Sequence, residues 1–349
     1  MAVNNEVLDL RLGEPIKARP EQMVSKAAPT SWQGLTHPCP TWDQFLFDVF
    51  EGSAELIDFV HRLLGYCITG VTREHILPVF WGAGRNGKGT IIEILRHVLG
   101  ELAGPVQAEM LLDQGRGRSS AAPSPDIMLL RGLRLAYASE TDRGSRFSPA
   151  RCKWLTGSDS LVGRWPHDRR AVTFRPTHKL LLLTNNKPSA PPEDFAFWER
   201  VVLVPFRLSF VSRDPEAENE RRADLQLFEK LKAEASGILA WLVRGCIAYQ
   251  ERGLAVPDIV RSATIEYRRD DDFLSEWIEE RCKIVPEGWT RSGVLYQDFE
   301  SWFQANWSTK VPSPVRFSKM LRSRFPKSVD AANCRIFQGI QLNPSEVIG

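Results

Sequence analysis

The sequence predicts an α/β protein with a parallel sheet at its centre, a helical domain before the sheet, and a helical, winged-helix-like domain after it. Residues 76–81 read as a buried strand that runs into a glycine-rich loop and then into a helical pattern. From about residue 76 to residue 210, short apolar runs alternate with loops and helices, which is typical of a parallel α/β core. Amphipathic helical stripes occur on both sides of this region.

Composition is that of an ordinary globular protein. The chain has 349 residues, a formal net charge of +2 and six cysteines, enough for about two or three domains. The cysteines lie far apart without a C-x-x-C pair, so we expect reduced core residues. No apolar run reaches about 18 residues and no signal-peptide core is apparent. We therefore expect no membrane partner and a cytoplasmic location, in the bacterial host if the source is a phage or prophage.

The first part of the chain changes character near residue 36. Residues 1–35 are polar and contain proline. Thr41 and Gln44 form a capping-box signature, and apolar residues at 45, 46 and 49, then at 56, 60, 63 and 64, form two helical stripes. We expect a joining segment over 1–35 and a small helical domain over 36–72.

The glycine-rich loop is the most informative feature. Its residues are Gly82, Ala83, Gly84, Arg85, Asn86, Gly87, Lys88, Gly89 and Thr90. Glycines let successive backbone amides converge on phosphates, and Lys88 adds a positive charge there. A strand, a glycine loop and a helix N-terminus in this order predict a nucleoside triphosphate ligand. Gly89 follows the lysine where Ser or Thr is usual, so the group that reaches Mg²⁺ stays open, with Thr90 as the nearest hydroxyl.

Polar residues at strand ends complete the predicted site. Glu140, with Asp142 as second candidate, follows the strand-like run 133–139, where a carboxylate can polarise water or hold Mg²⁺. Asn185 follows the continuous apolar run 179–184, where an amide can orient the attacking water. Arg200 precedes another strand, where a guanidinium can reach a triphosphate. In isolation, a solvated strand end is the alternative for Glu140, and a surface ion pair is the alternative for Arg200.

The ordered set of motifs resembles the superfamily-three helicases, and more narrowly the helicase part of poxvirus- and phage-type primase-helicases. The loop, the Glu140 strand, the run 153–159, Asn185 and Arg200 are similar to the Walker A, Walker B, B-prime, C and arginine-finger elements of that family. The segment 4–13 resembles its joining segment, 39–70 its helical collar, and 267–342 its winged-helix tail. We expect the ATPase domain over 73–212, a helical segment over 213–285 and the winged-helix-like domain over 286–349.

The resemblance implies an AAA+-related P-loop ring, usually of six subunits, with ATP between neighbours. Lys88 and the loop glycines would hold phosphates and Thr90 would approach Mg²⁺, together with Glu140 or Asp142. Glu140 would be the catalytic base, Asn185 would position water, and Arg200 would act on the adjacent subunit's ATP. The departures are Gly89, Ser139 where many members have a first acid, and Glu199 where an Arg-Arg pair is common.

A basic stretch before the apolar run 179–184, which we call the sensor strand because Asn185 follows it, carries the DNA-contact prediction. Arginines and a lysine alternate with Phe147, Trp154 and Trp165 between residues 143 and 170. The basic side chains can neutralise DNA phosphates, and the aromatic rings can stack on bases. The family places a channel hairpin here, so we expect Arg164, His167, Arg169 and Arg170 to contact DNA. A solvated loop or a subunit interface is the alternative. A second basic cluster near residues 310–327 suits duplex DNA, a partner, or solvent.

The leading hypothesis is an ATP-driven, ring-forming DNA helicase of a phage, virus or mobile element that translocates on single-stranded or forked DNA as a homo-hexamer. A primase or a polymerase is an expected partner. Primase activity is not expected, because the chain starts near the family's joining segment. The alternatives are a P-loop kinase for a small molecule, and a nucleotide-gated DNA-binding or origin-recognition module without unwinding activity.

Overall fold

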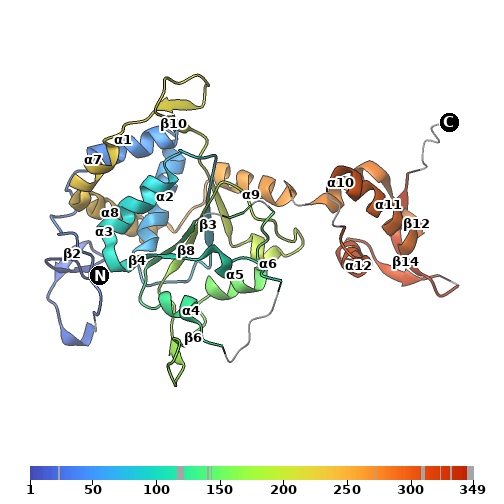
Figure 1. The fold of residues 1–349 in the computed structure, drawn as a ribbon, viewed down its shortest axis with the longest axis horizontal. Coiled ribbons are helices and arrows are strands. Elements are labelled where there is room, and N and C mark those ends of the chain that lie inside the picture. The colour runs from blue at the N-terminus through green and yellow to red at the C-terminus, as the bar shows by residue number, and fades with distance from the viewer. Residues whose placement is uncertain are drawn as a thin grey trace. The chain divides into compact units, whose positions relative to one another are not determined.

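A computed structural model describes all residues except 23, 116–121, 140, 143, 271, 308–310, 323, 331 and 344–349. The chain divides into two compact units. The first unit comprises Met1–Ala190 and Ala196–Tyr267, and the second comprises Pro191–Phe195 and Arg268–Gly349. Figure 1 shows the ribbon of the chain. Among the described residues, no helix is both long enough and apolar enough to cross a bilayer.

The first unit is built on a five-stranded parallel sheet, which confirms the predicted fold class. The strand order is β4-β5-β8-β3-β9. The strands are β3 (Leu77–Trp81), β4 (Ala103–Val106), β5 (Leu135–Ser139), β8 (Lys179–Thr184) and β9 (Val201–Pro205). Every residue of β8 is buried, as its uninterrupted apolar run predicts for a strand covered on both faces.

Helices and short strand pairs surround this sheet (Figure 1). The α-helices are α1 (Pro40–Val49), α2 (Ala54–Cys67), α3 (Lys88–Leu99), α4 (Pro125–Leu129), α5 (Pro149–Leu155), α6 (Phe195–Trp198), α7 (Leu227–Ala233), α8 (Ala235–Arg252) and α9 (Asp258–Asp270). The 3₁₀ turns are η1 (Pro20–Gln22), η2 (Gly100–Leu102) and η3 (Ala108–Met110). The strand pairs are β1 (Val7–Asp9) with β2 (Glu14–Ile16), β6 (Leu161–Gly163) with β7 (Val172–Phe174), and β10 (Ser209–Val211) with β11 (Glu220–Arg222).

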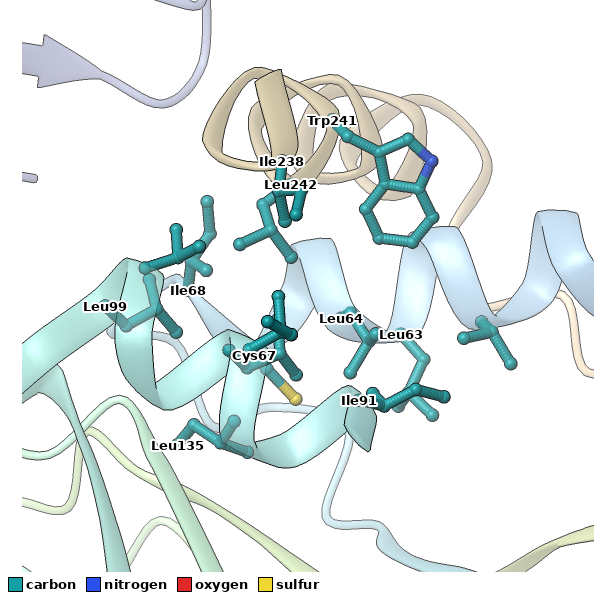
Figure 2. Packing of buried hydrophobic residues seen from close by; sticks show 14 of the residues in the cluster. Leu63, Leu64, Cys67, Ile68, Ile91, Leu99, Leu135, Ile238, Trp241 and Leu242 are labelled. Carbon is teal, nitrogen blue, oxygen red and sulfur yellow. The ribbon is translucent and has the colours of Figure 1, made fainter. Parts of the chain in front are cut away.

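One apolar core joins α2, α3 and α8 to the sheet. Figure 2 shows Leu64 and Cys67 of α2, Ile91 of α3 and Leu242 of α8 around the same space, with Leu135 of the sheet beside them. The crossing of α2 and α8 requires glycine, because a Cβ atom on Gly65 would lie 2.1 Å from the carbonyl carbon of Gly245. The helices predicted between residues 41 and 67 therefore share a core with α3, the helix that follows the glycine loop.

The start of α1 differs from the prediction. The capping box of Thr41 and Gln44 does not form: Cys39 is the N-cap residue, and the Gln44 side chain donates to Asp48. Both carboxylate oxygens of Glu234 instead accept the backbone N–H groups of Thr41 and Trp42, each at 3.0 Å. A carboxylate at a helix N-terminus satisfies free amides and interacts favourably with the helix dipole, so a distant residue replaces the local cap.

The second unit has its own aromatic core and a three-stranded antiparallel sheet of order β12-β14-β13. Its elements are α10 (Phe273–Arg281), β12 (Cys282–Arg291), α11 (Ser292–Asn306), α12 (Pro314–Arg322), β13 (Lys327–Val329) and β14 (Arg335–Leu342). Phe299 stacks on Phe317 with ring centroids 4.6 Å apart. The order helix, strand, two helices, two strands is that of a winged helix. Since α10 belongs to it, this unit begins before residue 286.

The cysteines only partly follow the prediction of reduced core residues. All six are free, and five are buried. Cys334 is exposed, because it lies just before β14 at the surface of the second unit.

Candidate nucleotide-binding and hydrolysis site

The glycine loop follows β3 and ends where α3 begins at Lys88. Arg85 and Gly87 have positive φ angles of 62° and 86°, which glycine adopts readily and an arginine adopts at a cost. Gly82 is required by packing, because a Cβ atom there would lie 2.1 Å from the Phe206 carbonyl oxygen. The side chain of Asn86 is buried and donates to the Ala83 carbonyl inside the loop. The backbone thus holds a tight turn directly before a helix N-terminus.

Lys88 lies at the centre of the site. Only 6% of it is exposed, and its Nζ donates to the Gly82 carbonyl at 2.7 Å and to Asn185 Oδ1 at 3.0 Å. Burial lowers the pKa of Lys88 to about 8. Among the residues that the structure describes, no acidic side chain forms an ion pair with it. A buried cation beside a glycine loop at a helix N-terminus is an arrangement that binds anions.

Two adjoining cavities surround the loop. The first has a volume of about 360 Å³ and is lined by Gly84, Arg85, Asn86, Gly87, Lys88, Gly89, Thr90, Ser139, Leu183, Thr184 and Asn185. The second has a volume of about 260 Å³ and shares Arg85, Gly87 and Thr90 with the first. Apolar side chains of α1, β10 and α7 line the second cavity, together with Leu225: they are Phe45, Phe210, Leu227 and Phe228. A cationic hollow therefore continues into an aromatic one.

Hydroxyl groups join the ends of β5 and β8 beside the first cavity. Thr184 ends β8, and its Oγ1 lies 2.6 Å from Oγ1 of Thr141, which follows β5. Thr141 Oγ1 also lies 2.8 Å from the Asn186 carbonyl, and the Asn186 backbone N–H donates to Thr184 Oγ1 at 3.0 Å. This network holds the turn that carries Asn185. Sequence reasoning missed Thr141 and Thr184, because only the pairing of β5 with β8 brings them together.

The predicted acids are less well placed. Glu140 lies outside the described residues. Ser139, directly before it, lines the first cavity, whereas Asp142 is exposed and is not among the cavity-lining residues. Thr90 does line the cavity. The structure therefore brings Thr90 to the site and leaves Asp142 outside it.

Arg200 lies at the amino ends of the sheet strands, whereas the glycine loop lies at their carboxyl ends. Its backbone carbonyl accepts the N–H of Leu77, the first residue of β3, at 2.6 Å, whereas the loop follows the last residue of β3. Because β3 has five residues, the two edges are roughly 16 Å apart. The Arg200 side chain donates to the Ala196 carbonyl at 2.7 Å, and its Nε is buried without a hydrogen-bond partner among the described residues. Arg200 does not line either cavity.

The predicted DNA-contact residues lie in the loop of the β6–β7 hairpin. His167 has a positive φ of 70°, and the Asp168 N–H donates to the Trp165 carbonyl at 3.2 Å to close the turn. Arg164 donates to the Asp168 carbonyl at 2.8 Å. Arg169 and Arg170 are exposed and form no ion pair with any acid in the described part of the chain. The hairpin thus presents cations and the half-exposed Trp165 together.

Comparisons with known proteins find one family model and several viral relatives. Residues 1–51 match the family described as D5 N terminal like. "Putative helicase L207/L206" of Acanthamoeba polyphaga mimivirus is 26% identical over 297 residues, which cover 80% of this chain and 30% of that protein. "Putative helicase 022R" of Frog virus 3 is 28% identical over 238 residues, which cover 65% of this chain and 24% of that protein. The chain thus spans less than a third of the length of these relatives.

A solved structure shares the fold. The apo structure of the NrS-1 C-terminal region superimposes with a TM-score of 0.50 and 12% identity, over 89% of this chain and 79% of that chain. The chain thus carries a D5 N terminal like segment and is similar to viral putative helicases, which is consistent with the resemblance to superfamily-three helicases of the primase-helicase type.

Proposed function

We propose that this chain is an ATP-dependent DNA helicase that assembles into a ring and translocates on single-stranded DNA during replication of a virus, phage or mobile element. The observation that carries the proposal is the pair of adjoining cavities around the loop. A cationic hollow that continues into an aromatic one suits a ligand with an anionic end and a flat apolar end, and a nucleoside triphosphate has both.

The loop glycines support phosphate binding. Cβ atoms on Gly84 and Gly89 would meet no other atom within 4 Å, so the packing of the protein does not require glycine at these positions. Close approach of phosphate oxygens to the backbone gives a reason for both residues. Glycine at position 89 is then part of the phosphate cradle.

In this proposal Lys88 holds the β- and γ-phosphates, and Asn185 orients the water that attacks the γ-phosphorus. Glu140 accepts the proton of that water as it attacks. Thr90 is the hydroxyl that holds Mg²⁺, which neutralises phosphate charge when bound. The apolar pocket of Phe45, Phe210 and Phe228 takes the base.

The distant position of Arg200 supports a shared site. A guanidinium at the far edge of the sheet does not reach the phosphate cavity of its own subunit, but it can meet the cavity of a neighbour in a head-to-tail ring. A ring also provides a channel into which the β6–β7 hairpin can project Arg169 and Arg170 toward a DNA strand. In this proposal residues 73–212 form the motor and 36–72 the collar, and the appended domain is the winged-helix unit, which includes α10.

The experiment is ATP hydrolysis by the full chain with and without single-stranded DNA. We expect DNA to stimulate turnover, and the double variant Arg169→Ala/Arg170→Ala to lose the stimulation but keep the basal rate. The matched control is Lys17→Ala/Arg19→Ala, which removes two exposed cations elsewhere. Turnover that is indifferent to DNA would favour a small-molecule kinase. Forked-duplex unwinding that survives both Lys88→Ala and Arg200→Ala would exclude the motor.

A further inference from the structure

The winged-helix unit has a helix with one buried and one exposed face. Phe317, Met320 and Leu321 of α12 are buried in the aromatic core. On the other side, Val315, Lys319 and Arg322 are exposed, and their spacing places them along one stripe of the helix. Val315 is 81% exposed, so the described residues of the unit leave this stripe uncovered.

Two strands extend the positive charge of the stripe. Lys327 in β13 donates from Nζ to Ser318 Oγ of α12 at 2.5 Å, and β13 pairs with β14, which begins at Arg335. Burial lowers the pKa of Lys327, and the charges of Arg335 and Arg322 lower it further. We call Lys319, Arg322, Lys327 and Arg335 the basic face.

The basic face is not neutralised by the protein. Within the described residues, none of its four members forms an ion pair. The same unit pairs other arginines: Arg281 with Asp298, Arg291 with Asp330, and Arg324 with Asp272. Asp330 is the one acid between residues 311 and 343. Its carboxylate is already bonded to Arg291 and to the backbone N–H groups of Ala332 and Cys334.

We propose that the basic face binds double-stranded DNA, with α12 along the major groove and the side chains of Lys319, Arg322, Lys327 and Arg335 on the flanking phosphates. This site is separate from the predicted hairpin contacts for a single strand. The duplex fits because cations fixed on a rigid helix and an adjoining sheet match a regular array of phosphates. A single strand fits less well, since the basic face has no exposed aromatic ring for base stacking.

The test measures binding of the full chain to a fluorescent 20-base-pair duplex, and to a single strand of the same length, over a range of salt concentrations. The triple variant Lys319→Gln/Arg322→Gln/Arg335→Gln removes exposed side chains and leaves the core intact. We expect its duplex Kd to rise at least tenfold. Three lost phosphate contacts should also reduce the slope of log Kd against log salt by about 2.7. Single-strand affinity and single-strand-stimulated hydrolysis should stay within twofold.

The matched control is Lys17→Gln/Arg19→Gln/Lys283→Gln, which removes the same charge from exposed positions outside the basic face. Equal duplex binding by the triple variant and the parent would overturn the proposal, and so would an equal loss in the control. A loss of single-strand binding as large as the loss of duplex binding would assign the basic face to general DNA attraction. A protein partner released by the triple variant, with duplex binding unchanged, would assign it to that partner.

Discussion

Lys88 and Asn185 form the direct polar link between the glycine loop and the tip of the sensor strand. Among the described residues, the acceptors of the Lys88 ammonium are neutral: the Gly82 carbonyl and the Asn185 amide oxygen. Neutral acceptors offset less of the desolvation of a buried cation than a carboxylate does. Phosphate can therefore displace Asn185 from the ammonium at little cost. This exchange would free Asn185 to meet water when nucleotide binds.

Asn185→Asp tests this exchange. The new carboxylate would lie about 3 Å from Lys88 Nζ and form a buried ion pair, so phosphate would have to displace a charged group. We expect the Kd for ATP to rise at least tenfold, measured by titration with a fluorescent analogue. Asn185→Ala should bind ATP within about threefold of the parent and lose hydrolysis by about 100-fold. Equal ATP affinities of the Asp and Ala variants would contradict this account of Lys88.

The threonine pair shows what residue-level sequence reading cannot supply. Asn185 was predictable because an amide directly follows a long apolar run. Thr184 and Thr141 stand 43 positions apart, and neither has a local pattern that distinguishes it from an ordinary strand-end threonine. Their contact depends on β5 and β8 being neighbours in the sheet. Their role is visible only once the sheet order is known.

At the level of elements, strand β8 has a candidate site residue at its carboxyl end and a buried lysine at its amino end. Asn185 follows its last residue, whereas its first residue, Lys179, is buried. The Lys179 ammonium donates to the carbonyl and to Oγ1 of Thr69, a residue that lies just after α2. It also lies 4.9 Å from the centre of the Tyr66 ring. Burial lowers the pKa of Lys179 to about 7. The contact fixes the start of the sensor strand to the helical region.

This pKa predicts a pH-dependent stability. The folded-state pKa of Lys179 is below its unfolded value of about 10.4, so between those values the unfolded chain binds more protons. Stability from this group must then rise with pH from about 7 to about 10, by at most about 1.4 kcal/mol per pH unit. We expect the unfolding free energy of the parent, minus that of Lys179→Met, to increase over this range in urea titrations. Parallel pH profiles would mean that Lys179 stays charged when folded.

Elements that follow from a local sequence pattern could be predicted, whereas features that depend on contacts between distant residues could not. Strands β3 and β8 and helices α1, α2 and α3 were predictable, because each follows from a continuous or periodic apolar pattern. The cap of α1 was not, since Glu234 lies 193 positions from Thr41. The opposite positions of Lys88 and Arg200 do follow from the sequence, because the glycine loop comes after a strand and Arg200 comes before one in a predicted parallel sheet. Arg200 stands fifteen positions after Asn185 in the sequence, and the parallel direction of β9 places it at the opposite end of the strands.

At the scale of the whole molecule, the position of Arg200 at the end of the sheet opposite to Lys88 bears on how many chains contribute to one active site. The carboxyl ends of the strands carry Lys88, Thr90 and Asn185, and the amino ends carry Arg200. If Arg200 acts on a triphosphate, a second copy of the chain must bring it there. The proposed mechanism therefore requires assembly before efficient hydrolysis.

A mixing experiment tests this requirement. Lys88→Ala subunits keep Arg200, and Arg200→Ala subunits keep the phosphate site, so each variant alone should hydrolyse ATP about 10³-fold more slowly or worse. In randomly mixed rings, about a quarter of the interfaces would pair an intact Lys88 with an intact Arg200 from the neighbour. We expect an equimolar mixture to recover about that fraction of parent turnover, measured as phosphate release.

The control replaces Arg200→Ala with the double variant Lys88→Ala/Arg200→Ala, which forms mixed rings without any complete interface. Its mixture with Lys88→Ala should stay inactive at every ratio. Mixed oligomers detected by native mass spectrometry without recovered turnover would show that Arg200 does not act across the interface. Full turnover by a chain that remains monomeric at all concentrations would do the same. Recovery confined to the first mixture requires one subunit's arginine to complete its neighbour's site, because no single chain in that mixture carries both groups.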